Sequence, residues 1–323
     1  MRRLIFVLAL IGAWLWWRGN DRVSHDNGGQ AAVLSDGFAF YDGHRVTELD
    51  RKGTQRKQHA FARDGEVRII GTPRGPEAGF IESKKVKLVR VSTGTGTVWG
   101  KSVRMLCEGV ATNDERFAVG WLEADDSVWF VHGDTRAQRT EADVVAPDDV
   151  VAASEPGIAD PKTWCGIASA HDLVALFWRG RDRLLMQTCT RKKCSNVSAT
   201  IAFDRNETLL GFGCLRNVCL LAARDRSGKA RLQLVTEAGS TKWKKPLETD
   251  KLEVSIVGAG DNAFAVGYST DSASEVLRVD RKGTFTKLWQ GPPSPHAPAL
   301  AWSRDQLLVG HPSGSPTLVA FPR

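Results

Sequence analysis

The feature that most constrains the fold of this chain is a short apolar segment that recurs at near-regular intervals. Phe117-Ala118-Val119-Gly120, followed by Trp121, returns as Phe264-Ala265-Val266-Gly267, followed by Tyr268. The equivalent positions in all the copies, weaker ones included, are Ala39, Gly79, Ala118, Ala175, Cys219, Ala265 and Leu308. Their successive spacings are 40, 39, 57, 44, 46 and 43 residues. Steps of this size are typical of the blades of a β-propeller.

Each unit consists of short apolar runs separated by turn residues, and few windows show a helical period. Asp50-Arg51-Lys52-Gly53 and Asp280-Arg281-Lys282-Gly283 are copies of one turn, with Gly at the fourth place as type I turns favour. We therefore predict an all-β fold, a seven-bladed β-propeller of four-stranded antiparallel blades over residues 31–323. The last unit is short, so we expect a strand from residues near 31–35 to complete it and close the ring.

Residues 1–18 have a different composition from the rest of the chain. Arg2 and Arg3 precede the apolar run Leu4 to Trp17. As a helix this run would be about 21 Å long at roughly 1.5 Å per residue, shorter than a bilayer core of about 30 Å. That length suits a signal peptide, whereas the flanking Trp residues and the lack of an adjacent small-residue cleavage site favour a retained signal-anchor. Whether the segment is cleaved stays open, and residues 19–30 would be a linker to an extracytoplasmic domain, periplasmic or secreted.

The six cysteines are consistent with export, because disulfides persist in oxidising compartments. Cys189 and Cys194 flank four residues, and so do Cys214 and Cys219. Each pair is spaced to close one β-hairpin. A zinc site is the alternative, but this spacing is wider than usual for zinc ligands and no His lies close in sequence to either pair. We expect disulfides in these two pairs, and we leave open whether Cys107 and Cys165 pair between neighbouring units.

The segment Leu88 to Trp99 resembles the quinoprotein-type (PQQ-repeat-like) propeller repeat, which reads as an apolar strand, a turn with Gly and a closing Trp. Leu234 to Trp243 and Val276 to Trp289 are poorer copies. Propellers of this type include pyrroloquinoline-quinone dehydrogenases and a periplasmic scaffold lipoprotein. This chain has neither an adjacent Cys-Cys pair nor a lipidation cysteine after the apolar segment, since its first cysteine is Cys107. The resemblance therefore implies an architecture and no particular activity.

No catalytic, metal-binding or cofactor-binding residue is identified from the sequence. Val254 to Ala263 is similar to the glycine turn of a dinucleotide-binding unit, but the repeat strand follows it where such a unit needs a helix. The seven histidines form no ligand spacing. We therefore expect no cofactor.

In this chain of net charge +7, the placement of the charged residues is more informative about function than any of these motifs. Basic residues collect at the expected tips between the third and fourth strands of the blades, and these are Arg51, Lys52, Arg191, Lys192, Lys193, Arg281 and Lys282. An acidic insertion at about 141–162 accounts for the longest spacing and should lie on the opposite face of the propeller.

Two functions follow from these observations. The first is a non-enzymatic scaffold of the cell envelope that binds a protein or an anionic polymer through one face and the membrane through its N-terminal segment, without binding nucleic acid. The alternative is a secreted or membrane-anchored hydrolase or oxidoreductase with a site at the mouth of the central channel, because propellers host both kinds of function. Clustered carboxylates or histidines in the channel would favour the enzyme, whereas small apolar and hydroxyl side chains would favour binding.

Overall fold

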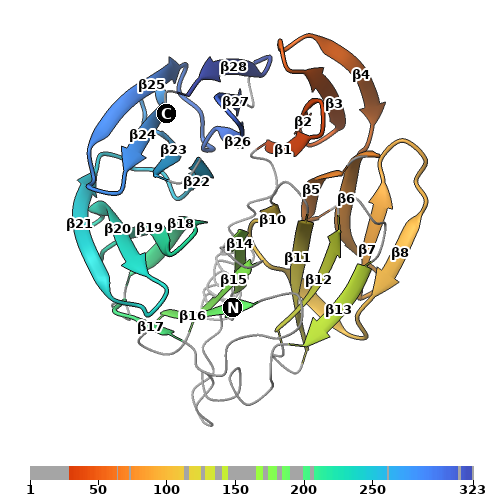
Figure 1. Ribbon diagram of the computed structural model, residues 1–323, viewed down its shortest axis with the longest axis horizontal. Helices are drawn as coiled ribbons and strands as arrows, with labels where there is room; N and C mark the ends of the chain where they lie inside the picture. Colours follow the sequence, from red (N-terminus) through yellow and green to blue (C-terminus); the bar gives the residue numbers. More distant parts are fainter. Residues whose placement is uncertain are drawn as a thin grey trace, which may run out of the picture.

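The computed structural model describes residues 29–63, 65–72, 74–112, 116–124, 128–134, 140–144, 165–169, 174–179, 184–189, 199–203, 207–259, 262–311 and 314–321. Within these ranges the chain forms seven antiparallel sheets around a common axis (Figure 1), which we number blades 1 to 7 in chain order. In each sheet the strands are paired in sequence order, starting with the strand nearest the axis, except that in blade 3 the first two short strands both pair with the third. The predicted seven-bladed β-propeller is confirmed.

The strands of the first four blades have the following bounds. Blade 1 contains β1 (Gln30–Leu34), β2 (Gly37–Tyr41), β3 (Arg45–Asp50) and β4 (Gln55–Ala60), and blade 2 contains β5 (Val67–Thr72), β6 (Gly75–Glu82), β7 (Lys85–Arg90) and β8 (Gly96–Trp99). Blade 3 contains β9 (Val103–Leu106), β10 (Ala111–Thr112), β11 (Arg116–Glu123), β12 (Val128–Asp134) and β13 (Thr140–Val144). Blade 4 contains β14 (Cys165–Ser169), β15 (Val174–Arg179), β16 (Leu184–Cys189) and β17 (Ala199–Ile201).

The remaining three blades complete the ring. Blade 5 contains β18 (Thr208–Leu215), β19 (Val218–Arg224), β20 (Ala230–Thr236) and β21 (Thr241–Leu247). Blade 6 contains β22 (Val254–Ala259), β23 (Ala263–Ser269), β24 (Ser274–Asp280) and β25 (Phe285–Gly291). Blade 7 contains β26 (Ala299–Ser303), β27 (Gln306–Gly310) and β28 (Thr317–Ala320).

The recurring apolar position lies on the second strand of every blade, as the repeat predicts. Ala39, Ala118, Ala175 and Ala265 are fully buried there. A Cβ added at Gly79 would lie 3.4 Å from Val119 of the next blade. Small residues recur at this position because neighbouring blades approach one another closely around the axis.

Most of the hydrophobic core lies between adjacent blades. One cluster joins Leu220 and Leu232 of blade 5 to Phe264 and Val266 of blade 6. Apolar side chains point to both faces of these sheets, so the strands read as continuous apolar runs without the alternation of a half-exposed sheet. Blade-on-blade packing is therefore the main source of stability in the ring.

The predicted closure of the ring by strand exchange is wrong. Gln30–Leu34 forms the innermost strand of blade 1, and the two-residue turn Ser35-Asp36 joins it to β2 as a local hairpin. Blade 7 has three strands among the described residues. The two ends of the ring meet through side chains, because Phe38 and Phe40 of blade 1 pack with Ala299 and Leu308 of blade 7. A tight hairpin closes at little loop entropy, which favours the local pairing over pairing with the far end of the chain.

The inner strand of blade 3 is broken between β9 and β10, and the break ties this blade to blade 4. Glu108 lies in the break and forms a parallel bridge with Gly166 of β14. The Sγ atoms of Cys107 and Cys165 lie 2.11 Å apart, so a disulfide joins the inner strands of the two blades. Gly109 has a φ of 76°, and a Cβ there would lie 2.6 Å from the carbonyl oxygen of Ile167. Glycine is required at this position both for its backbone conformation and for the close approach.

The second disulfide in the described residues joins Cys214 and Cys219, whose Sγ atoms lie 2.10 Å apart. These residues face each other across the β18–β19 hairpin, which is the pairing expected from their spacing. Cys189 is buried at the end of β16, and its predicted partner Cys194 lies outside the described residues. The pairing of Cys189 with Cys194 stays a prediction.

The predicted start of the acidic insertion is wrong, because residues 141–144 belong to β13, the outer strand of blade 3. The rest of the insertion and the N-terminal segment cannot be compared with the structure. Residues 1–28 and 145–164 lie outside the described ranges, as do Arg191, Lys192 and Lys193. Among the described residues no helix is long and apolar enough to cross a bilayer.

Candidate functional surface and central channel

The topology gives the disc two faces of different composition. Where the structure describes them, the turns between the first and second strands and between the third and fourth strands of a blade lie at one end of the disc, which we call the hairpin face. The turns between the second and third strands and the connections between blades lie at the other end, which we call the connection face. This division follows because all the inner strands run in the same direction along the axis.

The structure places the described basic tip residues on the hairpin face. Arg51 and Lys52 lie between β3 and β4 of blade 1, and Arg281 and Lys282 lie between β24 and β25 of blade 6. In both turns the leading aspartate caps the backbone: Asp50 accepts hydrogen bonds from the amides of Lys52 and Thr54 at 2.7 and 2.9 Å. Asp280 does the same for Lys282 and Thr284. The shared sequence thus codes for a capped turn in which Arg51, Lys52 and Lys282 are exposed and Arg281 is partly buried.

These capping bonds lower the pKa of both aspartates. The bond from the Thr54 amide is the main cause for Asp50, and the bond from the Thr284 amide is the main cause for Asp280. The two carboxylates therefore stay ionised at neutral pH, directed at backbone amides of their own turns. Each carboxylate offsets one of the two positive charges of its turn, so each turn keeps a net charge of +1.

Three further arginines lie on the same face and were missed by the sequence analysis. Arg74, Arg216 and Arg304 occupy turns directly after the inner strands of blades 2, 5 and 7. All three are exposed. Their position is readable from the sequence, because each of them follows an inner strand of the repeat.

The described turns of the two faces have opposite charge balance. On the hairpin face seven Lys and Arg residues accompany five Asp and Glu residues, namely Arg51, Lys52, Arg74, Arg216, Arg281, Lys282 and Arg304 with Asp36, Asp50, Glu237, Asp280 and Asp305. On the connection face six Lys and Arg residues accompany eight Asp and Glu residues, namely Arg63, Lys84, Lys101, Arg226, Lys229 and Lys251 with Asp42, Glu66, Glu207, Asp225, Glu248, Asp250, Glu253 and Asp271. The asymmetry is present without the acidic insertion.

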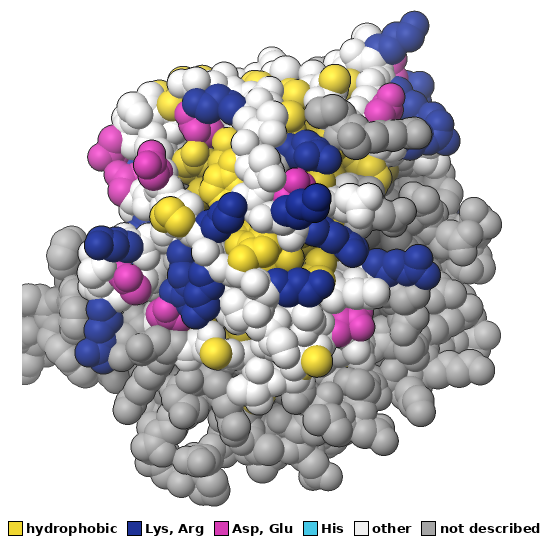
Figure 2. All heavy atoms as spheres, turned by 60° about the vertical axis from the view of Figure 1, so that its left-hand side comes forward, with side chains coloured by type: hydrophobic (Ala, Val, Ile, Leu, Met, Phe, Trp, Pro, Cys, Tyr) yellow, Lys and Arg dark blue, Asp and Glu magenta, His cyan; other side chains and the backbone are white. Residues whose placement is uncertain are grey.

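Basic side chains also follow the outer edge of blades 5 and 6. Figure 2 brings this side of the ring forward and shows Lys and Arg side chains around an area of hydrophobic ones. Lys242 and Lys244 are exposed on the outer strand β21, and the Nε1 of Trp243 donates to the carbonyl oxygen of Arg281 at 2.9 Å. Lysines on an outermost strand are a common protection against edge-to-edge pairing, so this edge is explained by the fold.

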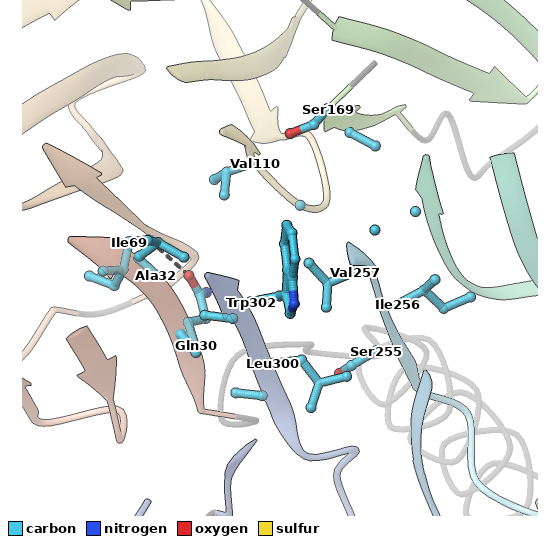
Figure 3. A pocket seen from close by; sticks show the side chains of 18 of the residues that line it. Gln30, Ala32, Ile69, Val110, Ser169, Ser255, Ile256, Val257, Leu300 and Trp302 are labelled. Carbon is cyan, nitrogen blue, oxygen red and sulfur yellow. Dashed lines mark hydrogen bonds between the residues drawn. The ribbon is translucent and has the colours of Figure 1, made fainter. Parts of the chain in front are cut away.

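The central channel is a cavity of about 1050 Å³ lined by the inner strands. Figure 3 shows Ile69, Val110, Val257, Leu300 and Trp302 around it. Hydroxyl groups lie among the apolar side chains, from Thr72, Ser169, Ser255 and Ser303. In the described residues no group of three or more His, Cys, Asp or Glu side chains is placed to hold a metal ion. The lining also includes the charged residues Arg51, Arg68, Glu108, Glu253 and Arg304.

Charged and amide groups near the connection face have partners within the protein. The Nε of buried Arg68 donates to the carbonyl oxygen of Cys107 at 2.9 Å, which links blades 2 and 3. Gln30 donates to the carbonyl of Val67 and accepts from the amide of Ile69, which links blades 1 and 2. Glu253 contacts His296 at 3.2 Å and links blades 6 and 7. These groups hold the ring together.

Comparison with known proteins identifies the fold of this chain but does not assign it to a family. No family model and no curated protein matches the sequence. Among solved structures, virginiamycin B lyase from Staphylococcus aureus is similar at 11% identity over 93% of this chain and 96% of that chain, with a TM-score of 0.54. The Cps50 (Swd1) β-propeller domain of Myceliophteria thermophila is similar at 14% identity over 93% of this chain and 98% of that chain, with a TM-score of 0.53.

A chain in the crystal structure of a mitotic checkpoint complex is similar at 12% identity over 91% of this chain and 87% of that chain, with a TM-score of 0.55. At such identities the likeness concerns the fold alone, because one propeller fold carries unrelated functions. The class that fold and topology define is the seven-bladed β-propeller.

Proposed function

We propose that this chain is a non-enzymatic interaction propeller of the cell envelope that binds an acidic protein or an anionic polymer through its hairpin face. The observation that carries the proposal is the opposite charge balance of the two faces. Exposed cations gathered on one rigid surface attract an anionic partner over a distance set by the ionic strength, about 8 Å at physiological salt. The composition of the channel supports binding in preference to catalysis.

The cellular setting is part of the same proposal. The apolar run Leu4 to Trp17 would hold the propeller at the membrane, and disulfides such as Cys107–Cys165 suit an oxidising compartment. The quinoprotein-type segments support a related ancestry, because Leu88 to Trp99, Leu234 to Trp243 and Val276 to Trp289 each span the third strand, turn and fourth strand of a blade.

The test compares two triple variants that change the net charge equally on opposite faces. The hairpin-face variant combines Lys52→Glu, Arg74→Glu and Lys282→Glu, and the connection-face variant combines Lys84→Glu, Lys101→Glu and Lys229→Glu; all six side chains are exposed. On immobilised poly-L-glutamate we expect wild type and the connection-face variant to be retained, and the hairpin-face variant to bind on the order of tenfold more weakly, since each exposed ion pair contributes about 0.2–1 kcal/mol.

Rising salt should weaken retention of wild type, and the melting temperature of both variants should stay close to that of wild type, because surface substitutions rarely change stability. Equal loss of binding in the two variants would mean that only net charge matters. Equal retention would mean that the hairpin-face cations are a solvated rim, and either result would contradict the proposal.

A further inference from the structure

The central channel has polarity that changes along its axis, and two of the hairpin-face cations, Arg51 and Arg304, lie at its mouth. We propose that the channel binds one small amphiphile, an apolar chain with a single anionic head, and that the head lies beside Arg304 at the hairpin face. The proposal goes beyond the partner binding described above. It assigns a separate ligand to the interior of the ring.

The middle of the channel offers an apolar wall that protein atoms leave partly uncovered. Val257, Leu300 and Trp302 are each only partly buried although they lie on inner strands. In Figure 3 the indole of Trp302 stands beside Val257 and projects into the open space. The Nε1 of Trp302 is buried and has no hydrogen-bond partner. Covering these side chains with an apolar chain would remove their surface from water, which is the main source of affinity in sites of this kind.

The mouth at the hairpin face carries the charge that would select an anionic head. Arg51 and Arg304 both line the channel there. Arg51 donates to the carbonyl oxygen of Ser35 at 2.9 Å, which holds its guanidinium near the mouth. No described residue forms an ion pair or hydrogen bond with the guanidinium of Arg304, so it is available to a ligand.

The backbone of Arg304 gives a second indication of function. Its φ is 59°, in the left-handed region where Gly or Asn is the ordinary choice. It opens the turn between β26 and β27, two residues after Trp302. A residue kept in a sparsely populated conformation is a reason to look for a role that offsets the strain. Here the role is to place a cation at the end of the apolar wall.

The opposite end of the channel indicates that the ligand has a single head group. Arg68, Gln30 and Glu253 are engaged by neighbouring blades, so no comparable cation is free to fix a second anion there. The five residues of β26 rise about 16 Å at roughly 3.3 Å per residue, a length comparable to an extended dodecanoate chain. The ligand class is therefore a single-chain carboxylate or similar anion with its tail directed into the channel.

The test uses dodecanoate below its micelle concentration, with uncharged dodecanol as the matched probe, in titration calorimetry of the full chain. We expect one site for dodecanoate and at least tenfold weaker binding of dodecanol. Arg304→Asn should weaken dodecanoate binding about tenfold while raising the melting temperature slightly, because asparagine adopts the same φ with less strain. A purely structural residue would not show these opposite effects.

The control is Lys84→Asn, at the other described turn where a basic residue has positive φ, which is 61°. Lys84 lies on the connection face away from the channel lining, so its replacement should raise stability and leave dodecanoate binding unchanged. Binding should also shift tryptophan fluorescence to shorter wavelength in wild type, and the shift should be lost in Trp302→Phe. Equal affinity for dodecanoate and dodecanol, equal effects of the Arg304 and Lys84 variants, or no binding of either probe would overturn the proposal.

Discussion

Replacing Cys107 and Cys165 together by alanine should lower the free energy of unfolding by about 4 kcal/mol, the chain-entropy value for a loop of this size. The bond spans 58 positions of sequence and joins blades 3 and 4 at their inner strands. Its loss frees the unfolded chain and removes a link at the point where the inner strand of blade 3 is broken. Denaturant unfolding of the variant and of wild type under non-reducing conditions measures the difference.

The matched control is the double alanine variant at Cys214 and Cys219, which lie only 5 positions apart. A loop this short should contribute roughly 2 kcal/mol, so this variant should unfold at a higher denaturant concentration than the first. Added dithiothreitol should destabilise wild type more than either substitution does, because it reduces both bonds, which together contribute about 6 kcal/mol. If the two double variants lose equal stability, the inter-blade bond has no special part in holding the ring.

Replacing Gly71 by alanine should destabilise the ring by about 3 kcal/mol, at the upper end of the usual cost of overpacking. A Cβ at this position would lie 1.5 Å from the carbonyl oxygen of Val33, in the inner strand of the neighbouring blade. Backbone cannot move aside as a flexible side chain does, so blades 1 and 2 would have to separate. We expect the melting temperature to fall by about 5–10 °C, measured by circular dichroism.

Gly314→Ala is the control for that substitution. A Cβ at Gly314 has no atom within 4 Å, and its φ is not in the left-handed region. The melting temperature should stay within about a degree of wild type, because surface changes of this kind are nearly neutral. A Gly71 variant as stable as the Gly314 variant would show that the inner strands tolerate separation.

The repeat made the architecture predictable from sequence. The positions of Ala118, Ala175 and Ala265 fixed the second strand of their blades, because contact with a neighbouring blade selects small apolar residues there. The turn around Asp280 was equally readable, since its capping bonds are local and depend on adjacent residues. The disulfide between Cys214 and Cys219 followed for the same reason.

Features that depend on contacts between blades were not predictable in the same way. Closure of the ring through Phe38 and Leu308 involves residues at opposite ends of the chain, and no local pattern distinguishes it from strand exchange. The break in the inner strand of blade 3 arises where Glu108 bridges to the next blade. The lining of the channel likewise depends on how the inner strands of different blades meet around the axis, and the successive lining residues Ile256 and Val257 do not differ in sequence from those of a buried strand.

Site-specific photo-crosslinking in the native envelope tests most directly whether the hairpin face binds the partner. A photoreactive residue is placed in turn at Lys52 and Lys282 on the hairpin face, and at Lys84 and Lys229 on the connection face; all four are exposed. We expect one acidic partner to be crosslinked from both hairpin-face positions and from neither connection-face position. The yield of the crosslinked product should fall as the salt concentration rises. Capture from the connection face alone, equal capture from both faces, or no capture from Lys52 and Lys282 would contradict the proposal.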